Sequence, residues 1–84
     1  MINSEMIKKD IYTTVYDLSP GKSGEIVDIE ADDTLKQRLL NMGLTPGTTI
    51  HFVRTAPLGD PINVKVRGFN LGIRKETAKR IIIK

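Results

Sequence analysis

The stretch from Leu44 to Ile73 constrains the fold more strongly than any other part of this chain. It holds three of the four prolines and four of the seven glycines, which divide it into short apolar segments. In its clearest segment Ile62, Val64 and Val66 alternate with polar or charged residues. Side chains of a strand point alternately to opposite faces, so this pattern predicts a half-buried β-strand.

Turn signals place two further strands beside that one. Pro46 and Gly47 suit the two corners of a type II turn, and a β-branched run over residues 48–55 follows them. Residues 56–61 form a second loop, and Gly68 allows a tight reversal before the alternating residues 69–73. The order strand, loop, strand, turn, strand predicts an antiparallel meander at the centre of the fold.

The rest of the chain adds short strands and a helical turn. We expect strands over residues 13–18, 24–31 and 80–84, and one helical turn over residues 75–79. In the strand over residues 24–31, Val27 and Ile29 fall on one face, whereas Ile26 falls on the other.

Between these strands the apolar period becomes helical. Leu35, Leu39 and Met42 fall at i, i+4 and i+7, which predicts a helix over about residues 34–42 with one apolar face. Thr34 and Gln37 have the spacing of a capping box, two aspartates precede them, and a glycine follows as a left-handed stop. Five or six short strands with this helix inserted predict a mainly β protein, a small, partly open antiparallel β-barrel.

Length and composition allow one small domain. The chain has 84 residues and no cysteine, so disulfides, thiolate metal sites and cysteine nucleophiles are excluded. Residues 1–12 have no clear period and are expected to form a partly ordered extension before a domain over residues 13–84. No signal peptide or spanning segment is predicted, which favours a cytoplasmic protein without direct membrane insertion.

Charge is unevenly distributed. Residues 1–42 carry five basic and eight acidic residues, whereas residues 43–84 carry eight basic and two acidic ones. A basic half favours an acidic partner, a nucleic acid or an anionic membrane surface, but a solvated basic face without a special partner is the preferred interpretation.

Catalytic and metal sites have little support in the sequence. His51 is the only histidine, it is expected to point outward, and no catalytic triad or phosphate-binding glycine loop accompanies it. Asp28 and Glu30 share the period of one strand face with Asp32, so they are weak candidates for a divalent metal such as Fe²⁺, with His51 as a nitrogen donor. Ligands from one strand face alone cannot surround an ion, so a solvated acidic edge is preferred and no cofactor is predicted.

Nucleic acid binding is also disfavoured. Lys65, Arg67 and Arg74 are expected to form a basic stripe on one hairpin. Phe52 and Phe69 fall on the apolar faces of their strands and are expected to point inward, which leaves no stacking platform for bases.

Binding to another polypeptide fits the sequence better. The loop Ala-Pro-Leu-Gly-Asp-Pro over residues 56–61 is stiffened by two prolines and exposes Leu58 between them. The alternative is a purely structural corner whose prolines prevent edge pairing.

The segments Met-Gly-Leu-Thr-Pro-Gly at 42–47 and Ala-Pro-Leu-Gly-Asp-Pro at 56–61 occur in this order in the chain. Together with three shorter segments they resemble the FeoA family, the small partner of the bacterial ferrous iron transporter. The resemblance covers about residues 13–84, and Met-Gly-Leu-Thr-Pro-Gly at 42–47 together with residues 56–61 is its most specific part. The other matching segments are Leu-Ser-Pro-Gly at 18–21, Gly-Glu-Ile-Val at 24–27 and residues 66–74.

This resemblance implies an SH3-like β-barrel without catalytic activity that works in the cytoplasm beside FeoB, a membrane iron permease with a GTPase domain. The predicted function is a docking or regulatory subunit recruited to the inner face of the membrane, and the alternative is a metal-sensing or metal-delivering module. The residues predicted to contact the partner are Leu44, Pro46, Arg54, Pro57, Leu58, Pro61, Arg67 and Arg74.

Overall fold

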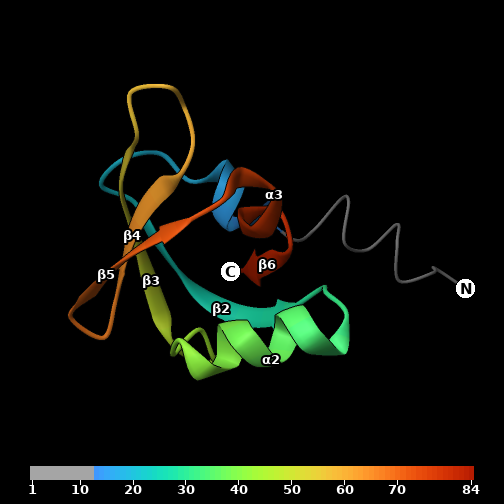
Figure 1. Ribbon diagram of the computed structural model, residues 1–84. Coiled ribbons are helices and arrows are strands. Elements are labelled where there is room, and N and C mark those ends of the chain that lie inside the picture. Colours follow the sequence, from blue (N-terminus) through green and yellow to red (C-terminus); the bar gives the residue numbers. More distant parts are fainter. Residues whose placement is uncertain (1–12) are drawn as a thin grey trace, which may run out of the picture.

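Six antiparallel strands form a sheet in the order β1-β6-β2-β3-β4-β5 (Figure 1). The computed structural model describes residues 13–84, and the predicted extension over residues 1–12 lies outside the described part. The strands are β1 (Thr13–Thr14), β2 (Ser23–Ile29), β3 (Thr49–Thr55), β4 (Ile62–Val66), β5 (Phe69–Ile73) and β6 (Ile81–Ile83). The helices are the 3₁₀ turn η1 (Val15–Asp17), α2 (Asp33–Asn41) and α3 (Lys75–Ala78).

The predicted meander is confirmed as β3, β4 and β5. Ile62, Val64 and Val66 of β4 are all buried, and Val64 lies opposite Phe52 of β3 and Leu71 of β5. Before β3, the predicted type II turn is present: Gly47 has a φ of 92°, and the amide of Thr48 donates to the carbonyl of Thr45 at 3.1 Å. The meander could be predicted because alternating apolar residues and turn residues depend only on neighbouring positions in the sequence.

The β4–β5 turn differs from the prediction in one residue. Arg67 and Gly68 both have positive φ, 52° and 86°, as a two-residue type I′ hairpin requires. Phe69 pairs with Val66, so it points to the predicted face. That prediction of an inward phenylalanine is nevertheless wrong about burial, because the Phe69 side chain is 71% exposed. The hairpin end extends beyond the part of the sheet that the core covers.

Strand β2 serves both halves of the sheet. Its first residues pair with β3, and Ile26, Asp28 and Ile29 pair with β6. The register shifts between Ile26 and Asp28, so Ile26 and Ile29 are both buried, whereas Val27 is only partly buried. This bulge corrects the predicted facing, because one extra residue reverses the alternation that follows it.

The first predicted strand is shorter than expected. Only Thr13–Thr14 forms β1, opposite β6, and Val15–Asp17 turns into η1. The carboxylate of Asp17 accepts a hydrogen bond from the amide of Thr14 at 2.9 Å, which closes the turn and ends the strand. Val15 is fully buried, so η1 adds to the core although it is not a strand.

Helix α2 is confirmed, but its first cap is not the predicted one. The side chain of Asp32 accepts from the amide of Leu35 at 2.8 Å, so Asp32 is the N-cap in place of Thr34. Gly43, with φ 96°, ends the helix. Met42 is 43% exposed, which contradicts its predicted place on the apolar face.

The end of α2 forms a Schellman motif. The amide of Leu44 donates to the carbonyl of Leu39, and the amide of Gly43 to the carbonyl of Leu40, both at 3.0 Å. In this motif the residue after the glycine packs on the last helical turn, and Leu39 and Leu44 are both buried.

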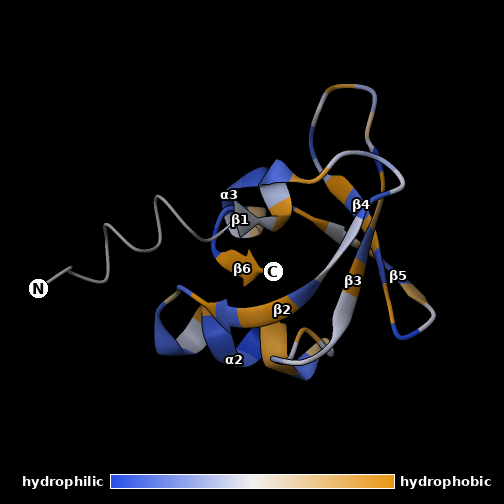
Figure 2. Cartoon of the chain, turned by 180° about the vertical axis from the view of Figure 1, so that it is seen from behind, coloured by the Kyte–Doolittle hydropathy of each residue, from blue (hydrophilic) through white to orange (hydrophobic). Residues whose placement is uncertain are grey.

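The core lies between the bent sheet, η1 and the two helices. Figure 2 shows β6 hydrophobic throughout, and all three of its isoleucines are buried. The predicted helical turn after β5 is confirmed as α3, whose Ala78 is fully buried. The core cluster comprises Val15, Ile26, Ile29, Leu39, Leu44, Ile50, Phe52, Ile62, Val64, Val66, Ile73, Ala78, Ile81 and Ile83.

Candidate docking site

The β3–β4 loop, residues 56–61, projects from one end of the molecule (Figure 1). The amide of Ala56 donates to the carbonyl of Pro61 at 3.0 Å, which closes the base of the loop. The amide of Gly59 donates to the carbonyl of Ala56 at 2.7 Å, and Gly59 has a φ of 91°. The Asp60–Pro61 peptide is cis. Leu58, at the tip, is 96% exposed, so the loop presents an apolar side chain to solvent on a hydrogen-bonded frame.

Asp60 attaches this loop to the start of α3. Its Oδ1 accepts a hydrogen bond from the amide of Lys75 at 3.0 Å, and its Oδ2 lies 3.7 Å from Nη1 of Arg74. The Arg74 side chain is 75% exposed, so the ion pair adds little stability and the hydrogen bond is the firmer contact. The carboxylate of Asp60 therefore joins the β3–β4 loop to the backbone at the start of α3.

The structure brings five of the eight predicted contact residues to this loop. Arg54 lies opposite Asn63 near the end of β3, close to the loop, and Arg74 reaches Asp60. The three loop residues complete the group, which we call the loop surface: Arg54, Pro57, Leu58, Pro61 and Arg74.

The other three predicted residues lie elsewhere. Leu44 is fully buried in the core, so the prediction that it contacts a partner is wrong: its side chain packs at the end of α2. Pro46 precedes β3 and Arg67 follows β4, so both lie at the opposite end of the β3–β4 hairpin, about 16 Å away along the five residues of β4. The predicted contact is therefore not one continuous surface.

Arg67 connects two turns at that opposite end. Its Nη2 donates to Oγ1 of Thr48 at 3.1 Å and of Thr45 at 3.3 Å, on either side of the Pro46–Gly47 corner. Arg74 follows β5 at the other end of the strand, so the predicted basic stripe of Lys65, Arg67 and Arg74 is interrupted. Of the three basic residues, only Lys65 and Arg67 lie close to each other.

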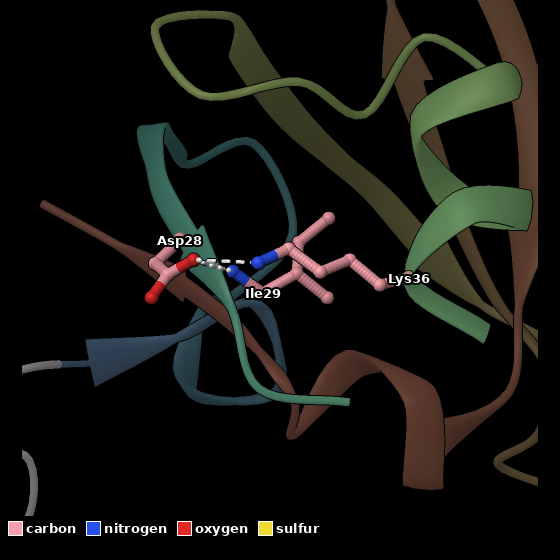
Figure 3. Close-up of polar contacts among 3 residues, drawn as sticks. All are labelled: Asp28, Ile29 and Lys36. Carbon is pink, nitrogen blue, oxygen red and sulfur yellow. Dashed lines mark hydrogen bonds and ion pairs between the residues drawn. The ribbon is translucent and has the colours of Figure 1, made fainter. Parts of the chain in front are cut away.

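The candidate metal ligands do not converge. Asp28 accepts a hydrogen bond from the amide of Ile29 at 2.8 Å and lies 3.7 Å from Nζ of Lys36 (Figure 3). Asp32 caps α2, and Glu30 lies beyond the end of β2. The predicted row of carboxylates on one strand face is therefore absent, because β2 ends at Ile29 and only Asp28 belongs to the strand.

His51 is exposed on β3, opposite Ser23 of β2 and Lys65 of β4. Its outward orientation agrees with the sequence analysis. Within residues 13–84, the His, Asp and Glu side chains form no group of three or more that could hold a metal ion.

Two residues of the candidate docking site were not identified from the sequence. Asp60 and Lys75 are 15 positions apart, and neither the loop pattern nor the helical turn indicates that one caps the other. An aspartate before proline in a loop is an ordinary turn signal, so only the fold reveals this contact.

None of the helices formed by residues 13–84 has the length and apolar character needed to cross a bilayer.

Known proteins share this sequence and architecture. The Fe(2+) transport protein A/Fe(2+) transporter FeoB fusion protein of Porphyromonas gingivalis is 35% identical over 65 residues, which cover 77% of this chain and 8% of that protein. The chain therefore spans less than a tenth of the length of this relative.

Solved structures agree with this relationship. A crystal structure of the iron uptake regulatory protein FeoA superposes with a TM-score of 0.78 at 34% identity, covering 88% of this chain and 97% of that one. The zinc complex of FeoA from Stenotrophomonas maltophilia, a prokaryotic SH3 domain protein, gives a TM-score of 0.75 at 25% identity, covering 86% and 89%. The predicted SH3-like fold is confirmed, although β1 and β5 remain two separate edges of the sheet. The FeoA domain model matches residues 13–84, and the chain belongs to the FeoA domain family.

Proposed function

We propose that this protein is a non-catalytic docking subunit of bacterial ferrous iron uptake, which binds a FeoB-type transporter through the loop surface. The partner is a membrane permease with a cytosolic GTPase domain, and docking recruits this protein to the inner face of the membrane.

Fusion in a relative supports this partner. In the protein of P. gingivalis, one polypeptide carries both the transport protein A part and the FeoB transporter. Fusion raises the effective concentration of one part near the other, which favours a contact between two surfaces even where separate chains bind weakly.

The exposure of Leu58 is the observation that carries the proposal. A leucine at 96% exposure contributes nothing to the core, and it sits on a loop closed by two hydrogen bonds and attached to α3 through Asp60. A surface that is already ordered loses little conformational entropy when it binds. Burial of one leucine in a partner pocket stabilises a complex by about 1.5–3 kcal/mol.

Charge gives the loop surface an orientation. Arg54 and Arg74 lie at its sides, and Asp60 is the only acidic residue between Leu44 and Ile73. Positive charge beside an apolar anchor favours an acidic partner segment and mainly accelerates association, which makes the binding rate sensitive to salt.

The test is binding of the Leu58→Asp variant to the cytosolic part of a FeoB-type transporter, measured by calorimetric titration. We expect at least a tenfold loss of affinity, because a charge replaces the apolar anchor. Phe69→Asp is the matched control, since Phe69 is also an exposed apolar residue but lies at the other end of the β3–β4–β5 meander. Equal affinities of the Leu58→Asp variant and the wild-type protein would refute the loop surface.

A metal-delivering module is the second proposal, and the zinc complex of the S. maltophilia protein favours it. On this chain the site would be a weak, exchangeable Fe²⁺ contact near Asp28, Glu30 or His51. An anaerobic Fe²⁺ titration followed by NMR separates the two proposals, because saturable shifts confined to these residues would favour delivery over docking.

A further inference from the structure

An open depression of about 550 Å³ lies on the face of the β3–β4 hairpin that points away from the core, near the β4–β5 turn. His51 and Lys65 lie directly opposite each other in the strand register, and both are exposed. Arg67 follows Lys65 by two positions. The depression is lined by Thr48, Thr49, His51, Lys65, Arg67 and Gly68.

Positive charge in this depression is not balanced by an ion pair. No carboxylate belongs to its lining. The ion pairs found among the described residues are those of Lys36, Arg74 and Lys79, so neither Lys65 nor Arg67 takes part in one. Lys65 and Arg67 both line the depression, so two positive charges lie there without a carboxylate in the lining. A bound anion would offset the repulsion between them.

A single carboxylate stands near the rim. Glu25 of β2 is exposed and lies opposite Thr49 in the register, although it does not line the depression. Residues that pair across antiparallel strands point to the same face of the sheet, so Glu25 places a negative charge beside Thr49 on the face that carries the depression. Glu25 therefore weakens anion binding without occupying the site, and its neutral variant serves as a test.

Arg67 is oriented before any ligand binds. Its Nη2 donates to Oγ1 of Thr45 and of Thr48, while Nε and Nη1 make no hydrogen bond to another described residue. Its Cδ lies 3.9 Å from where a Cβ on Gly43 would be, so the side chain runs beside the end of α2. The guanidinium is thus held at one nitrogen and keeps donors for a second partner.

The backbone of Arg67 supports a role for its side chain. Its φ of 52° is in the left-handed region, where asparagine and glycine are the residues that type I′ turns prefer. A residue with a Cβ, other than asparagine or aspartate, is less favourable for the turn itself, and such strained positions cluster at functional sites.

We propose that Arg67, Lys65 and His51 bind the phosphate group of a small phosphate ester or of a phospholipid headgroup in this depression. Guanidinium, ammonium and imidazole N–H groups all donate to phosphate oxygens, and the charge-assisted hydrogen bonds from the first two are the strong ones. The volume is within the range of small-ligand sites, and the open shape keeps the charges in contact with solvent. Binding is therefore weak and sensitive to salt.

The test is a titration of the ¹⁵N-labelled protein with inorganic phosphate, with ionic strength held constant by chloride. We expect saturable amide shifts at residues 48–51, 65 and 67–68. Linear shifts at all concentrations, or shifts of similar size around Lys79 and Arg80, would overturn the site.

Variants sharpen this test. Lys65→Gln should weaken phosphate binding about tenfold, and Glu25→Gln should strengthen it, because the first removes an attractive charge and the second a repulsive one. Lys79→Gln is the matched control, since it removes the same charge beside Tyr16 and Glu76, away from the depression. Equal affinities for the Lys65→Gln and Lys79→Gln proteins would contradict the proposal, and near-wild-type spectra establish that the variants fold.

Vesicles distinguish the two sources of the phosphate group. If phosphatidic acid vesicles bind the wild-type protein more tightly than inorganic phosphate does, and the Lys65→Gln variant loses that binding, the group belongs to a lipid headgroup. If inorganic phosphate binds but phosphatidic acid vesicles bind the protein no better than neutral phosphatidylcholine vesicles do, the ligand is a soluble phosphate ester. This site is independent of the loop surface, so the Leu58→Asp variant should bind phosphate as the wild-type protein does.

Discussion

Leu44 and Leu58 are both leucines predicted from the sequence to contact a partner, yet the structure gives them opposite roles. Leu44 has no exposed surface and belongs to the core cluster, whereas Leu58 is 96% exposed. Replacing each by alanine should therefore separate stability from binding.

The expected magnitudes differ several-fold. Leu44→Ala removes buried methyl groups and leaves a cavity, which costs about 2–5 kcal/mol. Domains of this size unfold with a free energy of about 4–13 kcal/mol, so the variant should lose a large fraction of its stability. A loss of 3 kcal/mol corresponds to a Tm lowered by roughly 12–24 °C. Leu58→Ala should change the free energy of unfolding by less than about 0.5 kcal/mol.

Urea denaturation followed by circular dichroism measures both values, and thermal unfolding checks them. The same proteins should be titrated with the transporter's cytosolic part under conditions in which the Leu44→Ala variant remains folded. A Leu44→Ala variant that loses less than about 1 kcal/mol would refute the packing argument at the end of α2. A Leu58→Ala variant that loses as much stability as we expect for Leu44→Ala, about 2–5 kcal/mol, would refute the assignment of Leu58 to the surface.

Three further changes test individual contacts. Gly24→Ala should destabilise the protein by about 1–3 kcal/mol, because the new Cβ would lie 2.7 Å from Cδ1 and 3.2 Å from Cβ of Ile83. Urea denaturation measures this loss, and an unchanged midpoint would contradict the close packing of β2 on β6. Asp32→Ala should cost about 1 kcal/mol through loss of the α2 cap, and a neutral result would place the cap elsewhere. Asp60→Ala should increase amide hydrogen exchange at Lys75 and in residues 56–61, and unchanged exchange would show that the loop is held by other contacts.

Features set by neighbouring residues could be predicted from the sequence. The Pro46–Gly47 turn, the alternation of β4 and the glycine stop of α2 depend on the conformational preferences of a few adjacent residues. The SH3-like fold was predicted from the resemblance to the FeoA family, and the solved structures of relatives confirm it.

Features set by contacts distant in sequence could not be predicted in this way. The bulge between Ile26 and Asp28 arises where β2 leaves β3 and joins β6, and no residue pattern within β2 indicates it. Phe69 follows the alternation correctly but lies at a hairpin end that nothing in the described part of the chain covers.

One missed feature of the site did have a local signal. Leu44 follows the glycine of a Schellman motif, and in that motif the residue after the glycine packs back on the helix. Applying this rule to residues 39–44 would have assigned Leu44 to the core. By contrast, the attachment of the β3–β4 loop through Asp60 depends on a residue of α3 and is visible only in the fold.

The central proposal is that the rigid loop over residues 56–61 meets another polypeptide. The most direct measurement is an NMR titration of the ¹⁵N-labelled protein with the cytosolic part of a FeoB-type transporter. We expect the largest amide shifts and line broadening at residues 54, 56, 58–60 and 74–75, with little change around α2. Binding that leaves these amides unperturbed would contradict the account.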